Sequence, residues 1–145
     1  MIGGTRPTTE NHDTQLAYAA GLFDATGEII HEPNGDIALR IANTHYEAII
    51  RVQFALGEGN YNHSGHSHQD INGIWHHSPT MHHLKIRGPL EVMYALEDLL
   101  PYLICKKREA WETYKHLKQR QLDRAYAKLD LLHGISAPKT RYMFT

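Results

Sequence analysis

The alternation of apolar and polar residues divides the first third of the chain into a helix and a hairpin. The segment TQLAYAAGLFDA has apolar residues at helical spacing, which predicts a helix capped by Asp13 or Thr14 and ended by Gly27. The segment EIIHEPNGDIALRIAN joins two alternating runs through Asn34-Gly35, the dipeptide preferred in tight hairpin turns. We therefore expect one helix followed by one β-hairpin.

The rest of the chain repeats this order and then adds helices. Residues 45–56, HYEAIIRVQFAL, are apolar at helical spacing, and the polar, glycine-interrupted stretch over 58–88 predicts a second, longer hairpin. Pro89 opens a third helix, Pro101 breaks it, and a long amphipathic helix follows over 106–132. This order predicts an α+β fold, in which a four-stranded antiparallel sheet carries helices on one face and leaves the other face open to a ligand.

Length and composition indicate one domain, with a leader over 1–12, a folded part over 13–133 and a tail over 134–145. The chain has 145 residues, 41% hydrophobic and 21% charged, which suffices for a buried core. No apolar run approaches the roughly 20 residues of a membrane-spanning helix, and the first residues lack the apolar stretch of a signal peptide, so we expect no membrane partner. The single cysteine, Cys105, excludes an internal disulfide framework and predicts a cytoplasmic location.

The charges are unevenly distributed along the chain, although the net charge is only −1. Residues 106–128 hold eight of the 15 lysines and arginines with three acids, whereas the preceding 105 residues hold five bases and 12 acids. Such a basic stretch produces a local positive field suited to a phosphate backbone, and it is equally typical of a solvated helix face.

Histidine is unusually frequent, with 12 in the chain and eight between His45 and His83. Because histidine titrates near neutral pH, mild acid would make this region strongly cationic. Clusters such as HSGHSH offer nitrogen ligands for zinc, but no Cys-x-x-Cys pair accompanies them, so we do not expect a structural zinc site.

Two segments carry a resemblance to a known family. YAAGLFDATGEI, residues 18–29, resembles the motif of the LAGLIDADG homing endonucleases, and the predicted αββαββα(α) order is that of the same family. GPLEVMYALEDLLPYLICKKREAWE, residues 88–112, resembles the segment that closes the family's domain and supplies an active-site lysine. The resemblance extends from about Thr14 to about Lys128.

The resemblance implies a site-specific endonuclease that hydrolyses double-stranded DNA with Mg²⁺ or Mn²⁺. Because only one motif is present, it implies a homodimer, which would bind a long, pseudo-palindromic target belonging to an intron, an intein or a free-standing gene. The protein would then work where its target lies, in the cytoplasm, an organelle or the nucleoid.

One motif position departs from the family pattern. The family places a metal-binding acid at the eighth motif position, which is Thr26 here, and a hydroxyl does not supply the charge that Mg²⁺ requires. Two nearby acids are alternative metal ligands: Asp24, whose equivalent commonly has a structural role, and Glu28, which shares the strand face of Thr26. The departure leaves a second interpretation open, a catalytically inactive DNA- or RNA-binding relative such as a maturase or a regulator.

The resemblance also implies further residues of a catalytic site. Lys106 matches the lysine beside the scissile phosphate, where a cation stabilises developing negative charge. Asn43 falls where the family has a polar residue that orders water, and His45 falls where a basic side chain often appears. Asn43 has an alternative role as a cap, because asparagine is favoured where a strand leads into a helix.

The open face of the sheet is expected to contact DNA, because a β-ribbon fits the major groove, where Arg40 suits guanine and Glu32 suits cytosine. The predicted contacts are Ile30, Glu32, Asn34, Ala38, Arg40, His76, His77, His83, Lys85, Arg87 and Lys107, with Tyr61, His63, His66, His68 and His82 as further candidates. Small residues on the first helix, Ala17, Ala20 and Gly21, predict close packing against the same helix of a second chain.

Overall fold

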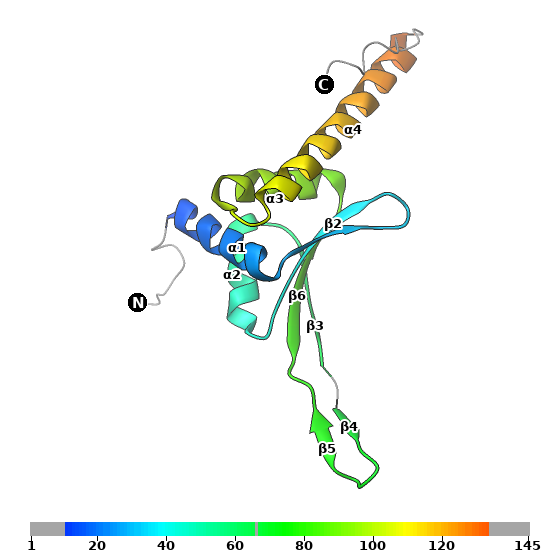
Figure 1. Cartoon of the computed structure of the whole chain (residues 1–145). Helices are drawn as coiled ribbons and strands as arrows, with labels where there is room; N and C mark the ends of the chain where they lie inside the picture. The colour runs from blue at the N-terminus through cyan, green and yellow to red at the C-terminus, as the bar shows by residue number, and fades with distance from the viewer. Residues whose placement is uncertain (1–10, 66, 134–145) are drawn as a thin grey trace.

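A four-stranded antiparallel sheet with helices on one face organises the computed structural model, which describes residues 11–65 and 67–133 (Figure 1). The elements are α1 (His12–Thr26), β1 (Glu28–His31), β2 (Ile37–Asn43), α2 (Tyr46–Leu56), β3 (Asn60–Ser64), β4 (Ser67–Gln69), β5 (Trp75–His77), β6 (Met81–Ile86), α3 (Pro89–Leu99), the 3₁₀ turn η2 (Leu100–Tyr102) and α4 (Lys107–His133). The predicted α+β order is confirmed. The predicted tail, and the leader up to residue 10, lie outside the described residues.

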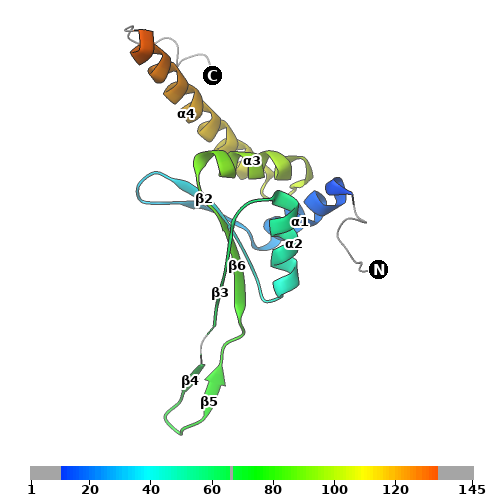
Figure 2. The same ribbon diagram turned by 180° about the vertical axis from the view of Figure 1, so that it is seen from behind.

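The strands of the sheet follow the order β1-β2-β6-β3, and each pairs antiparallel with its neighbour. The second hairpin is not continuous: β3 pairs with β6, and the residues between them form a separate two-stranded hairpin, β4–β5. In Figures 1 and 2 this outer hairpin projects well beyond the end of the sheet, away from the helices.

Alternation along the strands separates a buried face from an open one. Leu39, Ile41, Leu84 and Ile86 are almost fully buried and form the core with side chains of the helices. Figure 2 shows α1 and α2 on this side of the sheet. The residues of opposite parity form the other face, called the open face below, which the helices leave uncovered.

The helix ends follow local hydrogen bonding. Helix α1 begins earlier than expected, because the side-chain oxygen of Asn11, rather than of Asp13 or Thr14, accepts the capping hydrogen bond, from the backbone N–H of Thr14 at 2.8 Å. The first half of α4 buries Ala110 and Leu117 in the core, whereas its second half projects from the body (Figure 1). No helix in residues 11–65 and 67–133 is long and apolar enough to cross a membrane.

Candidate functional site

The turn between α1 and β1, called the motif turn below, is determined by close packing. The backbone N–H of Gly27 donates to the carbonyl of Phe23 at 2.7 Å, and a Cβ atom at Gly27 would overlap the Phe23 ring, which is itself fully buried. Only glycine allows the chain to pass this close to the ring. The turn therefore ends α1 abruptly and starts β1 at Glu28.

Asp24 holds the motif turn against the segment that precedes α4. Its Oδ1 accepts from the backbone N–H of Lys106 at 2.9 Å, and its Oδ2 accepts from that of Ile104 at 2.8 Å. Burial raises the pKa of Asp24, but these backbone donors, with Cys105 and the charge of Lys106, outweigh it and hold the pKa below its usual value. The carboxylate therefore has a structural role in this chain.

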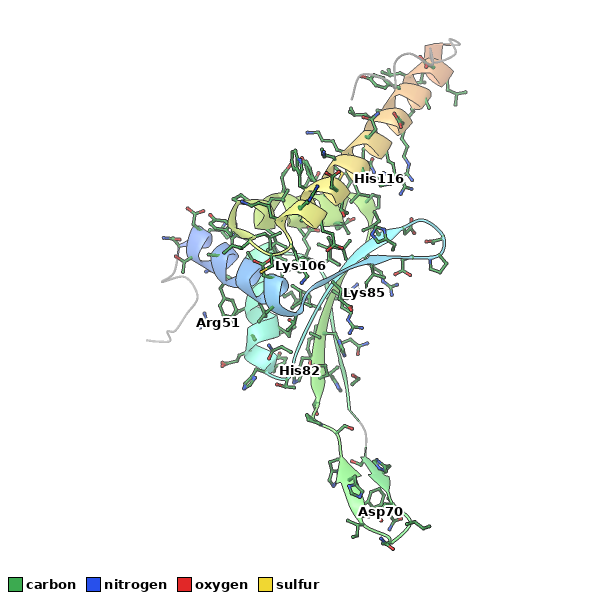
Figure 3. The ribbon with its side chains drawn as sticks, in the orientation of Figure 1. Arg51, Asp70, His82, Lys85, Lys106 and His116 are labelled. Carbon is green, nitrogen blue, oxygen red and sulfur yellow. The ribbon has the colours of Figure 1, made fainter. Side chains whose placement is uncertain are left out.

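Lys106 reaches the motif turn through the same contact. Its Nζ donates to the carbonyl oxygen of Asp24 at 3.0 Å, so the ammonium group lies at the C-terminal end of α1. Figure 3 shows Lys106 between α1 and the sheet. A cation is favoured there, because the last carbonyls of a helix carry partial negative charge. The structure thus places the ammonium group of Lys106 beside the motif turn.

The other two members of the predicted catalytic set serve the turn into α2. The Oδ1 of Asn43 accepts from the backbone N–H of His45 at 2.8 Å, and the Nδ1 of His45 lies 3.4 Å from the hydroxyl of Thr44. Strand pairing places Asn43 opposite His82, on the helix-covered side of the sheet. Asn43 does not cap α2, whose N-cap is His45; its side chain instead closes the turn before the helix, and these contacts connect neither residue to Lys106.

Glu28 and Thr26 differ in what they offer to a ligand. Thr26 is exposed, but its hydroxyl donates to the carbonyl of Leu22 at 3.2 Å and carries no charge. The Glu28 side chain is 56% exposed on the open face, where Oε1 lies 3.3 Å from the Nε of Arg40. Glu28 is therefore the accessible carboxylate at the motif turn, and it is already paired with a cation.

The open face carries a polar row across all four strands. Glu28 pairs with Arg40, Arg40 with Lys85 and Lys85 with Asn60 in the register of the sheet. A second ion pair joins the Nζ of Lys85 to the Oε2 of Glu32 at 3.4 Å. Glu28 and Glu32 together balance Arg40 and Lys85, so this part of the open face has no net charge.

The other residues predicted on the first hairpin occupy different positions. Ile30 lies on the open face opposite Ala38, but Ala38 is only 1% exposed, so its prediction as a DNA contact was wrong: the side chain is too short to emerge between its neighbours. Asn34 is exposed in the hairpin turn, where its Oδ1 accepts from the backbone N–H of Asp36 at 3.0 Å.

The basic and histidine contacts predicted near and after β6 are also spread out. Arg87 is exposed just beyond β6, and Lys107 is exposed at the start of α4. His83 lies on the open face, where its Nε2 is 3.0 Å from the Ser64 hydroxyl. His76 and His77 lie on the outer hairpin.

Three further candidates lie on the other side of the sheet. His82 and His63 pair in one row with Asn43, and Tyr61 pairs with Leu84 of the core. The hydroxyl of Tyr61 lies 2.6 Å from the Nδ1 of His82. Successive residues of a strand point to opposite faces, and Lys85 lies on the open face, so His82 and its partners lie on the side of the helices. The prediction that these residues line the open face was therefore wrong. His66 lies outside the described residues, and His68 belongs to the outer hairpin.

The outward side of α1 is lined by small residues. Ala17 and Gly21 are exposed, and a Cβ atom at Gly21 would meet nothing within 4 Å. Ala20, in contrast, is fully buried in the chain's own core, so its prediction as a dimer contact was wrong. The exposed strip continues one helical turn later at Ala25, which was not predicted although it follows the i, i+4 spacing.

The motif turn of one chain does not by itself supply the ligands of a divalent-metal centre. Among the described residues there is no group of three or more histidines, cysteines or acids placed to hold a metal ion. Thr26 is neutral, both oxygens of Asp24 accept backbone hydrogen bonds, and Glu28 is paired with Arg40. Divalent metals of the magnesium type require several oxygen ligands with negative charge, and this turn offers one carboxylate.

Comparison with known proteins identifies the fold. No family model matches the sequence, and no curated protein is significantly similar to it in sequence. The structure of the homing endonuclease I-CvuI in complex with its target, with calcium present, has 20% identity and a TM-score of 0.54 over 88% of this chain and 85% of that chain.

Two other solved structures have the same arrangement. The archaeal intron-encoded homing endonuclease I-Vdi141I, complexed with DNA, has 16% identity and a TM-score of 0.54 over 81% of this chain and 74% of that one. The LAGLIDADG meganuclease I-CpaMI, bound to uncleaved DNA, has 17% identity and a TM-score of 0.53 over 75% of this chain and 37% of that one. The chain therefore has the LAGLIDADG endonuclease fold, as the sequence predicted.

Proposed function

We propose that this chain is a sequence-selective DNA-binding protein of the LAGLIDADG type, which binds duplex DNA with the open face of its sheet and does not cut it. The observation that carries the proposal is the open face itself: an antiparallel sheet without helices on one side, crossed by the polar row of Glu28, Arg40, Lys85 and Asn60. A β-ribbon of this kind fits the major groove. The solved structures with the same fold are DNA complexes, which supports the same ligand.

The polar row suits the reading of base edges. Arginine donates two hydrogen bonds to guanine, and glutamate accepts from the amino group of cytosine. The pairs Glu28–Arg40 and Glu32–Lys85 are solvent-accessible, and ion pairs of this type contribute only about 0 to 1 kcal/mol. Bases and phosphates can therefore replace the internal partners at little cost in free energy.

The exposed small-residue strip of α1 supports a homodimer. Ala17, Gly21 and Ala25 let a second α1 helix approach closely, since their side chains occupy little space. A two-fold dimer presents two identical open faces, so its DNA site would be long and pseudo-palindromic.

The absence of cleavage follows from the motif turn. Lys106 lies beside the turn, where its ammonium group could contact a phosphate of bound DNA, but Thr26 supplies no charge for a metal ion. Binding would thus survive without the chemistry of phosphodiester hydrolysis.

Site selection followed by a cleavage assay tests this proposal. Duplexes that the protein binds are first enriched from a random library, and the enriched site is then incubated with Mg²⁺ or Mn²⁺ and the chain as it stands, Thr26→Asp or the neutral control Thr26→Asn. We expect binding by all three and cutting by Thr26→Asp alone. Failure to enrich any duplex contradicts DNA binding, and preferential enrichment from a parallel RNA library points to an RNA-binding relative.

A second candidate function is metal-dependent DNA cleavage that relies on Glu28. Its carboxylate is more than half exposed, directly follows the motif turn and would be present twice in a dimer, where Mg²⁺ or Mn²⁺ would act as the cofactor. Cutting of the selected site by the unmodified chain, lost in Glu28→Gln but kept in Glu32→Gln, establishes this function and excludes the first.

A further inference from the structure

The ribbon that projects from the sheet carries an unusual set of charges. Residues 59–84, called the histidine ribbon below, contain no lysine or arginine, one acid (Asp70) and seven histidines. Phosphate contacts dominate the affinity of proteins for DNA, and they are normally made by permanently charged side chains. If this ribbon contacts DNA, any positive charge that it presents to the phosphates has to come from histidine.

The one acid of the ribbon is hydrogen-bonded to a histidine. At the tip of the outer hairpin, Oδ2 of Asp70 accepts from Nε2 of His76 at 2.7 Å, while Oδ1 accepts from the backbone N–H groups of Asn72 and Ile74, both at 2.9 Å. These contacts, the one with His76 foremost, hold the pKa of Asp70 below its usual value. Figure 3 shows Asp70 at the far end of the ribbon.

The remaining histidines of the outer hairpin, His68 and His77, are exposed on its two faces. The His68 ring stacks on that of His76, with centroids 5.2 Å apart, and Nδ1 of His77 is hydrogen-bonded to the hydroxyl of Ser67. Asp70 is the charged group that faces these histidines, with no other element of the fold packed against them in the described residues. His68 and His77 are therefore well placed to take up protons beside a polyanion.

Nearer the sheet, the histidines lie beside Arg40 or beside one another, and in the described part of the chain no acid pairs with them. His83 lies on the open face near Arg40 and His82, and its Nδ1 is buried with no hydrogen-bond partner among the described residues. Burial, Arg40 and His82 lower the pKa of His83. On the other side of the sheet, His63 and His82 pack with Tyr61 and Tyr46, so protonation there places like charges together.

The fixed charges beside the ribbon do not compensate for this lack of permanent cations. Arg40 is paired with Glu28, and Lys85 is paired with Glu32. These two ion pairs add no net charge at the base of the ribbon, so positive charge on the ribbon itself has to come from the histidines of the outer hairpin.

We propose that the outer hairpin of the histidine ribbon is a phosphate-binding arm, whose exposed histidines His68 and His77 take up protons when DNA binds, so that pH sets the affinity of the arm. This inference rests on the proposed DNA-binding function. Affinity rises as pH falls through the range in which histidine titrates, about 6.5, by up to about tenfold per pH unit for each proton taken up. Each protonated histidine on a phosphate also steepens the salt dependence of log K by about 0.9.

Fluorescence anisotropy with a labelled, mixed-sequence duplex of about 40 base pairs measures this electrostatic contribution directly. The full-length protein is titrated at about pH 8 and about pH 6 over a range of salt concentrations. We expect at least tenfold tighter binding and a steeper salt slope at the lower pH. His68→Gln/His77→Gln removes two protonation sites of the arm and keeps the His76–Asp70 pair, so most of this gain should disappear.

Two further double variants test whether the effect comes from the charge of the arm. One makes that charge permanent, and the other removes histidines elsewhere in the protein. His68→Lys/His77→Lys makes the charge permanent and should bring the affinity at about pH 8 close to that of the unmodified protein at about pH 6. His31→Gln/His116→Gln is the matched control: both residues lie beside Ile37 on the side of α4, and the pH gain should persist.

The outcomes distinguish the inference from the function on which it rests. Duplex binding whose affinity and salt slope do not change with pH overturns the inference and leaves DNA binding intact. The inference is likewise overturned if His68→Gln/His77→Gln keeps the full increase in affinity between about pH 8 and about pH 6. A duplex bound at neither pH contradicts DNA binding itself and removes the inference with it.

Discussion

The motif turn and the outer hairpin are held in place by different forces. At the motif turn, backbone atoms and buried apolar surface fix every position: Gly27 lies against Phe23, and Asp24 is held by the amides of Ile104 and Lys106. The outer hairpin has no buried residue, and its tip is organised by the side chain of Asp70. The first region therefore determines stability, and the second is free to respond to pH and to a ligand.

The largest expected effect is a loss of stability in Gly27→Ala. The new Cβ would overlap both the ring and the carbonyl of Phe23, which cannot retreat from a filled core, so the free energy of unfolding should fall by about 3 kcal/mol. Urea denaturation followed by circular dichroism measures the change. Gly21→Ala is the matched control: the site is open, and removing a glycine from a helix should stabilise the monomer by about 0.5 to 1 kcal/mol. Equal effects at both positions would contradict the packing described for the turn.

The next largest effect is expected for Asp24→Asn, which weakens two backbone hydrogen bonds to a carboxylate and should cost about 2 kcal/mol. The pKa of Asp24 is lowered in the folded state, so its stabilisation is complete above the usual pKa of about 4 and is lost as pH falls through the lower, folded value. The free energies of unfolding of the unmodified protein and of Asp24→Asn, measured by urea denaturation from neutral to acid pH, should therefore become equal in acid. A constant difference across this range would show that the charge of Asp24 contributes nothing.

A smaller effect, on binding rather than on folding, is expected on the open face. Glu28→Gln removes a carboxylate from a surface that meets phosphate and frees Arg40, so affinity for a mixed-sequence duplex should rise severalfold. Its stability should change by less than about 1 kcal/mol, because the ion pair is exposed. Anisotropy and urea denaturation on the same samples separate the two quantities. A substantial loss of stability without a change in affinity would place Glu28 among structural residues.

Much of the fold was predictable because it depends on local periodicity. Apolar spacing predicts the helices, and Asn34-Gly35 predicts the first hairpin. Alternation with the apolar residues Leu39 and Ile41 correctly places Arg40 on the open face. The wrong predictions concern residues whose exposure depends on neighbouring side chains. Ala38 has the right parity but is covered, and Ala20 lies on the right helix but points inward.

The candidate site was harder to predict than the fold, because its contacts join distant segments. The sequence places Asp24 and Lys106 in two recognisable segments, but only the folded chain shows that the Asp24 carboxylate binds the backbone of the second segment. The break between β3–β6 and β4–β5 was likewise missed, since the stretch over 58–88 is polar throughout and has no apolar pattern to register the strands.

The smallest effect on stability is expected at the outer hairpin, in Asp70→Ala, because no core residue depends on this region. The substitution removes the acceptor of three hydrogen bonds, which Asn72, Ile74 and His76 donate. The tip of the hairpin should therefore become disordered, and the four-stranded sheet should stay ordered. Amide hydrogen exchange should quicken for Asn72 and Ile74 and stay unchanged for Leu84 and Ile86 in β6. Ile71→Ala, at a 99% exposed neighbour, is the control and should leave exchange at both places unaltered. Faster exchange throughout β6 in Asp70→Ala would mean that the outer hairpin supports the sheet, and the separation of the molecule into a rigid motif turn and a responsive arm would then be wrong.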